Sequence, residues 1–438
     1  MKKKILAGIL SISMIFPLIA CGNNDENGQE NQNQSQGENQ IDEDGDSNAG
    51  SDDVITIASF PDQPKDALMS AIEAANLDFD VEIIEYPQNE YENKIKMAFG
   101  TDAGTDIVLI DGPNVASYAV TGVLEPLDSY WDDDDFNDLV DSSKSTATYL
   151  DKIWCAPLNE ANTLIFYNKD VFDELGIEAP KKLEDTWTFD ELLDVCEKVT
   201  IPGERYAIMP QMFSLANLNE GMAFTQMLWI WMAGGNVLNE DATKADGYFN
   251  SDESKAGIEF YAKLFEEGYA TTEDVINAYE TGKVVMWVNG PWVVGNLARE
   301  FPDFNWGATP MPKGQRSASG AGSWNLSISA ESNNKEKAWE VVQAITGKEG
   351  QAIWCEETGN VPARKSILDS DETYSNYPYD IVNEQLQETA IARPVTPVYP
   401  QISEALQKCF AAVAYGEDVD SSVEEAVKIM EEALATVK

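Results

Sequence analysis

The chain has 438 residues, no histidine and a formal net charge of −48 at pH 7. The lack of histidine excludes catalytic triads and zinc sites that depend on an imidazole, and it excludes a histidine pH switch. A surface this acidic repels nucleic acid and anionic lipid head groups, so we expect no nucleic-acid partner. Among enzymes, the composition leaves open the carboxylate chemistry that glycosidases use.

The first twenty residues are typical of an export signal. Three lysines at positions 2–4 precede an apolar stretch at 5–20, which Pro17 interrupts. This stretch is too short and too broken for a stable transmembrane span. The run from Leu18 to Cys21 resembles a bacterial lipobox, which implies a mature chain that begins at a lipidated Cys21. An ordinary signal peptide that happens to contain a cysteine is the alternative.

Residues 21–52 combine this cysteine with a polar, acidic segment. From residue 22 the segment is almost entirely Asn, Gln, Asp, Glu, Gly and Ser, with Ile41 as its one large aliphatic residue. It cannot bury enough apolar surface to offset its ordering entropy, so we predict a disordered linker. Asp42, Asp44 and Asp46 are spaced as in a calcium loop, but the glycine and the closing glutamate of such a loop are missing, so no metal is expected. Removal of residues 1–20, with three lysines and no acid, would change the charge from −48 to −51.

The body that follows begins as an alternation of strands and helices. Apolar runs predict strands at 54–58, 81–84 and 107–110, and the last is continuously apolar, as a buried parallel strand is. Helical spacing predicts a helix that Pro64 opens and another over 91–99. This order favours an α/β architecture. A body of about 385 residues is too long for one core, so two lobes are expected.

The second half is predicted to be mainly helical, with short strands such as 284–287. Asn168 caps a helix that Gly176 closes, and Thr188 and Glu191 form a capping box for the next. Apolar residues at helical spacing predict further helices over 254–267 and from 422 to the C-terminus.

Two groups of residues raise the question of a disulfide or a metal site. Cys155, Cys196, Cys355 and Cys409 form no C-x-x-C pair and lie in apolar surroundings. Buried free thiols are therefore the prediction, although spacing alone leaves a disulfide open. The acidic run 132–135 is predicted to be a solvated face or a helix start rather than a metal site.

Seven stretches of the body, in order, resemble the extracellular solute-binding family typified by maltose-binding protein. No one of them is specific alone, but together they cover the chain from about residue 54 to its C-terminus. The stretches are 105–108, 124–127, 156–170, 186–192, 282–292, 306–312 and 320–329.

The resemblance implies an α/β, two-lobed fold of the type II periplasmic-binding-protein kind, with discontinuous lobes and a ligand cleft between them. The N-terminal lobe would comprise 53–160 and 291–345, and the C-terminal lobe 161–290 and 346–438. The chain would cross between lobes near 160–164 and near 286–291. Crevices at domain interfaces and at switch points of α/β sheets are also where physical reasoning places a ligand.

The function that the resemblance implies is binding rather than catalysis. We expect a monomer, without a cofactor or a metal, that captures a mono- or oligosaccharide by lobe closure. It would present this sugar to the membrane subunits of an ABC importer. The acylated Cys21 would hold it in the membrane lipid, at the extracytoplasmic face of the bacterial cell membrane.

Aromatic plates suit the apolar C–H faces of a sugar, so tryptophans are the first candidates for ligand-binding residues. The resemblance places Trp292 where the family stacks a ring on a sugar, and Phe224 at another binding aromatic. Trp324 lies in a loop of small residues, where its side chain has room to project. Trp229 and Trp231 are two residues apart on an apolar helix, so only one is expected to face the cleft, and Trp231 is the candidate. Core packing is the alternative for these residues.

Carboxylates and amides are expected at the hydroxyl rim. Glu160 matches a family carboxylate at the first crossing, and an ionised acceptor forms the stronger hydrogen bonds. A hinge ion pair is the alternative for Glu160. Asp111 and Asn114 follow the third strand, and Phe60 and Asp62 follow the first, at the carboxyl ends where parallel sheets bind ligands.

The chain departs from the family at two aromatic positions, which are Ile110 and Leu406 here. This departure puts maltose itself in doubt but leaves a sugar plausible. Tyr399, in the proline-rich stretch 393–400, is a candidate to replace one ring, because the prolines hold that stretch extended.

Two other functions stay open at this stage. A polyamine or another cation would also suit acidic and aromatic groups, through cation–π contact. A surface glycosidase would use Glu160 and Asp111, and would need their carboxyl groups about 5 to 10 Å apart.

Overall fold

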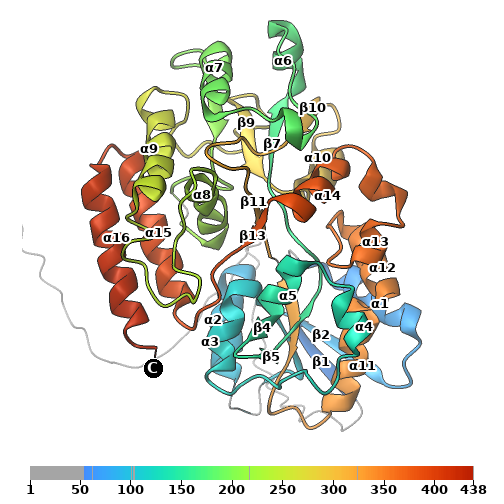
Figure 1. Cartoon of the computed structure of the whole chain (residues 1–438). Coiled ribbons are helices and arrows are strands. Elements are labelled where there is room, and N and C mark those ends of the chain that lie inside the picture. The colour runs from blue at the N-terminus through green and yellow to red at the C-terminus, as the bar shows by residue number, and fades with distance from the viewer. Residues whose placement is uncertain are drawn as a thin grey trace, which may run out of the picture. The chain divides into compact units, whose positions relative to one another are not determined.

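The structure is a computed structural model, and it describes residues 54–61, 63–99, 101, 104–216, 218–322 and 324–437. The predicted export signal, Cys21 and the linker lie outside the described residues, and so does Asp62. The body has a mixed α/β fold with two main sheets (Figure 1). No helix in the described part of the chain is both long enough and apolar enough to span a membrane.

The first sheet is mixed, with the strand order β2-β1-β3-β12-β6. β1 pairs in parallel with β2 and β3, whereas β12 runs antiparallel to β3 and β6. Every residue of β3 is buried, as its continuous apolar pattern predicts. All three strands predicted for this half are confirmed. The bounds are β1 Val54–Ser59, β2 Asp80–Glu85, β3 Ile107–Asp111, β6 Ala156–Pro157 and β12 Trp324–Ile328.

Helices from distant parts of the sequence cover this sheet. α1 packs against α11 and α12, and it buries Leu68 and Ile72 in the first core, as the helical spacing predicts. The bounds are α1 Lys65–Ala75, α2 Gln88–Ala98, η1 Gly112–Asn114, α3 Val115–Ala119, α4 Asp133–Asn137, α5 Asp141–Ala147, β4 Thr148–Tyr149, β5 Lys152–Ile153, α11 Lys335–Thr346 and α12 Lys348–Thr358.

The second sheet has the strand order β10-β7-β9-β8. β7 is antiparallel to β10 and β9, and β8 is parallel to β9. Alternate residues of β7 enter different cores, because successive side chains of a strand point to opposite faces: Ile165 and Tyr167 lie in one core, and Leu164 and Phe166 in the other. The bounds are β7 Leu164–Asn168, β8 Tyr206–Met209, β9 Val284–Asn289 and β10 Trp306–Thr309.

Helices pack on both faces of the second sheet. One core includes residues of α6, α7, α8, α9, α15 and α16, and the other includes residues of α10, α13, η3 and α14. The bounds are α6 Lys169–Leu175, η2 Leu183–Asp185, α7 Phe189–Val199, α8 Glu220–Met232, α9 Asp252–Glu266, α10 Val293–Glu300, α13 Lys365–Leu368, η3 Glu372–Ser375, α14 Tyr379–Glu388, α15 Tyr399–Ala414 and α16 Val419–Leu434.

A small parallel sheet joins two segments that are far apart in sequence. β11 (Ser319–Ala321) pairs with β13 (Ala390–Ala392). In Figure 1 this pair lies between the two main sheets. β11 leads into β12 of the first sheet, and β13 leads into Arg393 and then α15.

Two segments differ from the predicted lobe boundaries. β10 pairs with β7 of the second sheet, although the sequence predicts 291–345 for the N-terminal lobe. α12 carries the buried Trp354 into the first core, although 346–438 is predicted for the C-terminal lobe. The chain passes from β6 to β7 through 158–163, which overlaps the predicted crossing at 160–164, and it returns to the first sheet between β10 and β12, not near 286–291. An apolar run predicts a strand or a helix, but it does not identify the partner of that element.

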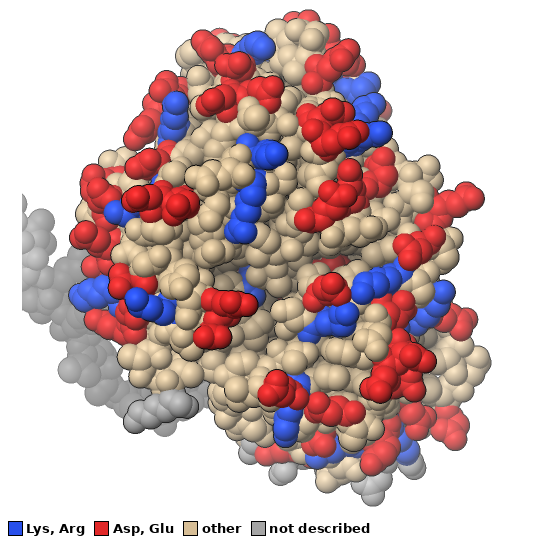
Figure 2. Space-filling view, in the orientation of Figure 1, with Lys and Arg blue, Asp and Glu red and all other residues tan. Residues whose placement is uncertain are grey.

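The charged surface and the state of the cysteines both agree with what the sequence predicts. Acidic side chains are spread over the face seen in Figure 2, with fewer lysines and arginines between them. Cys155, Cys196, Cys355 and Cys409 are buried free thiols, as predicted.

Candidate ligand-binding site

The carboxyl ends of β1 and β3 carry aromatic and acidic residues at one edge of the first sheet. Phe60 follows β1, and its ring centroid lies 4.6 Å from that of Trp324 and 4.8 Å from that of Tyr91. Trp324 lies directly opposite Asp111 in the β3–β12 ladder. Phe60 is buried, whereas Trp324 is only partly buried. Phe60 therefore supports an indole that keeps accessible surface.

Asp111 is paired with a buried arginine that follows β13. Arg393 donates from Nη1 to Asp111 Oδ2 at 2.9 Å and from Nη2 to Oδ1 at 2.6 Å. This two-bond fork is the strongest way for a guanidinium to bind a carboxylate. Arg393 Nη2 also donates to the carbonyl oxygen of Gly322 at 3.3 Å. The sequence predicts that Asp111 binds the ligand, but in the structure Arg393 holds its carboxylate and neutralises its charge.

Glu220, the first residue of α8, brings a second carboxylate to the same guanidinium. Arg393 Nη1 donates to Glu220 Oε1 at 2.8 Å, and the Ser403 hydroxyl donates to Oε2 at 2.5 Å. The Tyr399 hydroxyl also donates to Oε1. Asp111, Glu220, Arg393, Tyr399 and Ser403 therefore form one charged cluster that joins β3 of the first sheet to α8 and α15.

Burial and charge act against each other in this cluster. Burial raises the pKa of Glu220 above its ordinary value, and the positive charge of Arg393 opposes that rise. For Arg393, burial alone would lower the pKa, but the charges of Asp111 and Glu220 raise it well above its ordinary value. The guanidinium is therefore always charged, and it holds Asp111 beside it.

Two aromatic rings of the second lobe, which is the part of the chain packed around the second sheet, adjoin the charged cluster. The guanidinium carbon of Arg393 lies 5.1 Å from the ring centroid of Phe224, within the range of a cation–π contact. The Phe224 and Trp292 centroids are 6.3 Å apart. Trp292 follows β9 and is only partly buried. Two glycines make room for these rings: a Cβ on Gly290 would lie 2.0 Å from the Trp292 ring, and one on Gly320 would lie 2.8 Å from the Phe224 ring.

Glu160 lies at the first crossing, and protein groups already bind its carboxylate. Ser142 and Ser143 donate to Oε2 at 2.8 and 2.6 Å, and the backbone N–H groups of Ala161 and Gly322 donate to Oε1. Only 1% of Glu160 is exposed. This environment favours the hinge alternative over a ligand contact, through hydrogen bonds rather than the ion pair considered from the sequence.

The two crossings between the sheets are hydrogen-bonded to each other. Asn162 Nδ2 donates to Ser319 Oγ at 3.1 Å, and the Gly320 N–H donates to Thr163 Oγ1 at 2.9 Å. Gln385 of α14 donates to the Thr163 carbonyl oxygen at 2.8 Å. The chain segments that connect the lobes therefore form one ordered junction beside the aromatic rings.

The remaining candidates are placed away from an accessible site. Trp231 is 3% exposed and packs in a core of the second lobe, and Trp229 is fully buried and donates to the Pro210 carbonyl oxygen at 2.9 Å. Tyr399 is also fully buried, so it supports Glu220 instead of offering a ring to a ligand. Asn114 is partly buried in η1.

Arg393 and Glu220 are not among the site residues that the sequence predicts. Arg393 stands in the proline-rich stretch that suggested Tyr399, but nothing local shows that a distant aspartate pairs with it. Glu220 looks like an ordinary acidic residue in the first turn of a helix, where such residues are common. The signal that could have found them is weak: an arginine, in a chain with only 29 basic residues, next to a predicted cleft segment.

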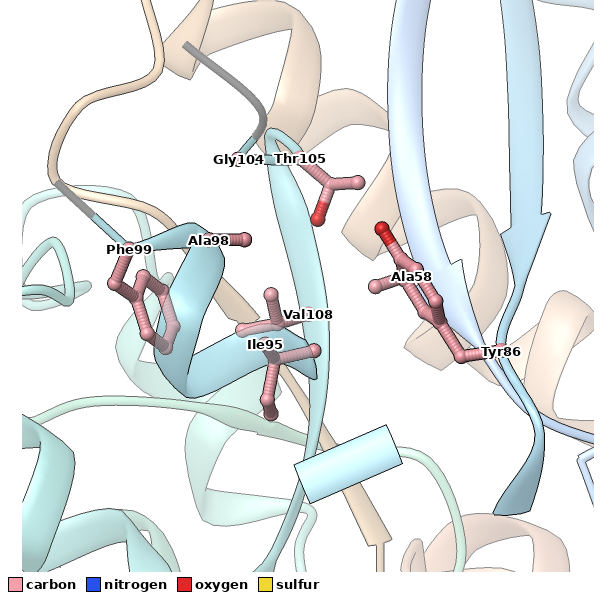
Figure 3. A pocket seen from close by; sticks show the side chains of 8 residues that line it. All are labelled: Ala58, Tyr86, Ile95, Ala98, Phe99, Gly104, Thr105 and Val108. Carbon is pink, nitrogen blue, oxygen red and sulfur yellow. The ribbon is translucent and has the colours of Figure 1, made fainter. Parts of the chain in front are cut away.

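Two small cavities lie apart from these residues. The first, between α2 and the first sheet, has a volume of about 10 Å³, enough for one water molecule (Figure 3). The second, of about 20 Å³, adjoins β8 and includes Gln211 and Glu273 in its wall. Neither is lined by a predicted ligand-binding residue, and both are too small for a sugar.

Residues 67–379 match the family model described as bacterial extracellular solute-binding protein, and the chain belongs to this family. The match confirms the predicted resemblance. Members of this family are binding proteins rather than enzymes, and the family is extracellular.

Individual relatives cover most of the body. A solute-binding protein of an ABC transporter from Thermotoga lettingae, bound with α-D-tagatose, is 25% identical, with a TM-score of 0.76 over 87% of this chain and 100% of that one. The galactooligosaccharide-binding protein of Bacillus subtilis is 23% identical over 92% of this chain and 90% of its own length. The maltotriose-binding protein of Pyrococcus abyssi is 25% identical over 67% of this chain and 62% of its own length. The structural likeness confirms the predicted two-lobed α/β fold class.

Proposed function

We propose that this protein binds a carbohydrate between its two lobes and delivers it to an ABC importer. The observation that carries the proposal is a set of aromatic rings from both lobes around one charged cluster. Trp324 and Phe60 come from the first lobe, and Trp292 and Phe224 from the second. Trp324 and Trp292 are only partly buried, so their indoles offer flat apolar faces for sugar C–H groups, and the buried rings of Phe60 and Phe224 pack beside them. The hinge junction beside these rings would allow the lobes to close over the ligand.

The charged cluster supports a neutral, hydroxyl-rich ligand over a cation. Asp111 is buried against Arg393, and both oxygens of Glu220 accept hydrogen bonds from protein groups, so neither carboxylate is free to contact a polyamine. The partly buried indoles of Trp292 and Trp324 instead suit the apolar C–H faces of a sugar. The relatives named for galactooligosaccharide and maltotriose, and the neighbour bound with tagatose, are in line with this choice.

The environments of Asp111 and Glu160 also argue against the glycosidase alternative. It requires one free carboxylic acid and one free carboxylate across the sugar bond. Asp111 is tied to Arg393, and the Glu160 carboxylate is bound by four protein donors. A binding protein needs neither group to be free.

Ligand-dependent stabilisation tests the proposal. The full chain is heated with a panel of mono- and oligosaccharides, and a true ligand raises the melting temperature because it binds only the folded state; at 100 times Kd it adds about 2.7 kcal/mol. Calorimetry then gives the affinity of each hit. Putrescine and spermidine serve as the cationic arm of the panel. Stabilisation by the polyamines and by no sugar would replace the proposed ligand class.

We further propose that Cys21 carries a lipid and that 22–52 tethers a monomeric body to the outer face of the cell membrane. The lipobox-like Leu18–Cys21 run and the polar composition of 22–52 support this arrangement. Bacteria fed an alkyne-labelled fatty acid should incorporate the label into the wild type but not into the Cys21→Ala variant. Labelling of both would contradict the anchor, and sedimentation of the detergent-solubilised protein would test the monomer.

A further inference from the structure

The pairing of β1 with β3 stops short of the carboxyl ends of these strands. Between the described residues of the two strands it runs as far as Ala58 and Val108, two of the residues around the cavity in Figure 3. In the same register, Ser59 would come next, opposite Leu109. In a parallel ladder each residue bonds to the residues on either side of its partner, so the Leu109 N–H would donate to the Ala58 carbonyl oxygen. A side chain stands in the way of this bond.

The side chain that takes this position is Tyr91 of α2, whose hydroxyl bridges the two strands. The Leu109 N–H donates to Tyr91 Oη at 2.9 Å. Oη lies 2.8 Å from the Leu109 carbonyl oxygen and 3.3 Å from that of Ala58, and the hydroxyl has one proton to donate to them. Only 2% of Tyr91 is exposed. One oxygen atom of a buried side chain is therefore interposed where the ladder would continue.

This interruption coincides with the topological switch point of the first sheet. The strand order β2-β1-β3 means that the chain leaves β1 for a neighbour on one side and then crosses to a neighbour on the other side. At such a point a crevice opens outside the carboxyl ends of the strands, and open α/β sheets bind their ligands there. Tyr91 thus fills the base of the crevice between β1 and β3.

The ring of Tyr91 also contacts the aromatic residues at this edge of the sheet. Its centroid lies 4.8 Å from that of Phe60 and 6.4 Å from that of Trp324, and the Tyr91 and Trp324 rings are nearly perpendicular, at 78°. Phe60 and Trp324 are themselves 4.6 Å apart. Aromatic pairs at such distances favour particular relative orientations. The position of the buried tyrosine therefore affects the orientation of the partly buried indole.

We propose that Tyr91 is a positioning residue of the carbohydrate site. Its hydroxyl sets the separation of the strand ends that lead into Phe60 and Asp111, and its ring sets the orientation of Trp324. This inference rests on the proposed carbohydrate binding. Because Tyr91 is buried, it acts through these residues and not through contact with the sugar.

Tyr91→Phe tests the inference without a ligand, because it keeps the ring and removes the hydroxyl. The Leu109 N–H then loses its acceptor, so the ends of β1 and β3 should shift, and Trp324 with them. The full chain is labelled with 5-fluorotryptophan, and the signals of Trp324 and Trp306 in the fluorine NMR spectrum are assigned from Trp324→Phe and Trp306→Phe. We expect Tyr91→Phe to move the Trp324 signal and to leave that of Trp306, in the second sheet, in place. An unchanged Trp324 signal would overturn the inference.

A double-mutant cycle then tests whether Tyr91 acts on binding through Trp324. Calorimetry uses the sugar that most stabilises the wild type. Tyr91→Phe should weaken binding at least about twofold, the lower end of the coupling between residues in contact. The same change made in Trp324→Ala should have a smaller effect, because the indole that it would displace is gone. An equal effect in both backgrounds contradicts the positioning role.

Tyr261→Phe is the matched control, since it also removes a buried hydroxyl that has a hydrogen-bond partner. Tyr261 is fully buried in a core of the second lobe, and it donates to Gln211 Oε1 at 2.8 Å. This variant should lower the melting temperature, yet keep the Trp324 signal and the sugar affinity of the wild type. If it weakens binding as much as Tyr91→Phe does, lost stability explains both results and the inference fails. If the wild type binds no sugar, the proposed carbohydrate binding fails, while the Trp324 signal still decides whether Tyr91 positions that indole.

Discussion

Arg393 connects distant parts of the chain through one guanidinium. It binds Asp111 of β3, Glu220 of α8 and the Gly322 carbonyl oxygen between β11 and β12. Its own position, directly after β13, adds a further segment. Few side chains in the described structure combine so much burial with so many charged contacts, so its removal has consequences for folding as well as for binding.

Arg393→Met is expected to destabilise the protein strongly. Asp111 would remain buried without its partner, and breaking a buried ion pair from one side typically costs about 3 to 5 kcal/mol. Urea unfolding followed by tryptophan fluorescence measures the change. Arg299→Met, at a side chain that is 70% exposed, is the control and should stay close to the wild type. A loss under about 1 kcal/mol in Arg393→Met would show that the cluster contributes little to stability.

Glu220 gives the protein a specific dependence on pH. Because burial raises the pKa of Glu220 above its ordinary value of 4.5, the folded state holds this proton more tightly than the unfolded state does. The resulting stabilisation is complete below 4.5 and is lost as the pH rises through the raised pKa. Of the groups that face Glu220, the charge of Arg393 and the hydrogen bonds from Ser403 and Tyr399 lower its pKa, whereas the charge of Asp111 adds to the rise that burial causes.

In Glu220→Gln, this contribution disappears because the amide does not titrate. We expect the melting temperature of the variant to fall less than that of the wild type between pH 5 and pH 8. Glu404→Gln, at a side chain that is 66% exposed, should follow the wild type. The assignment is wrong if the wild type and Glu220→Gln show the same pH profile.

Trp292→Ala tests the central ring of the site. Loss of a stacking surface should weaken the binding of the identified sugar by about 1 to 3 kcal/mol. Trp306→Ala serves as the control, because Trp306 pairs with Asn168 at the opposite end of β7 from the first crossing. Calorimetry compares both variants with the wild type. Equal affinity in Trp292→Ala and the wild type would remove Trp292 from the site.

At the scale of secondary-structure elements, Arg316 closes the C-terminal end of α8. Its Nε donates to the Trp231 carbonyl oxygen at 2.7 Å, and its Nη2 donates to that of Gly235 at 3.1 Å. The last carbonyl groups of a helix have no partner within the helix, and a positive charge there also suits the helix dipole. α8 begins at the candidate site with Glu220, and Arg316 binds at its opposite end.

Arg316→Ala is expected to lower the free energy of unfolding by about 1 to 2 kcal/mol, because it leaves these carbonyl groups without a charged donor. Arg316→Lys should lose less, since it keeps the charge but not the fork. Denaturant unfolding measures both changes. A larger loss for lysine than for alanine would contradict the capping role.

Helices and strands that nearby residues specify could be predicted from the sequence. Which elements pack or pair with one another could not. The Asn168 cap and the reciprocal Thr188–Glu191 capping box are present, because caps depend on residues within one turn. By contrast, α16 begins at Val419 with Asp418 as its cap, three residues before the predicted Ser422, since several polar residues compete for that role.

The same distinction applies to the candidate site. Phe60 and Trp292 follow β1 and β9, Trp324 begins β12, and Phe224 lies on α8. Their role in binding a ligand stays a prediction. Trp231 and Tyr399 are buried instead, because an apolar helix pattern does not show which tryptophan faces outward. Arg393 and Asp111 are 282 residues apart in sequence, and no local sequence pattern predicts that they form an ion pair.

At the scale of the whole molecule, the net charge of −48 opposes compaction. The salt bridges between described residues mostly join exposed side chains, and exposed pairs typically contribute only about 0 to 1 kcal/mol each. Acidic side chains also lie in groups scattered over the face in Figure 2, so within these groups like charges are close neighbours. Repulsion among carboxylates is therefore a general destabilising contribution.

Salt should relieve this repulsion. The Debye length falls from about 30 Å at 0.01 M to about 10 Å at 0.1 M ionic strength. We expect the melting temperature to rise over this range, measured in parallel with sodium chloride and choline chloride to exclude a specific ion. A constant or falling melting temperature in both salts would show that repulsion is not a significant factor.

Glu160 couples the two chain passages that connect the lobes. One of its oxygens holds the N–H groups of both Ala161 and Gly322, which belong to chain passages 161 residues apart in sequence. Because both passages are hydrogen-bonded to one carboxylate oxygen, this oxygen couples a rotation in one passage to a rotation in the other. Loss of these two hydrogen bonds should therefore change the rates of lobe opening and closing more than it changes the affinity for the ligand.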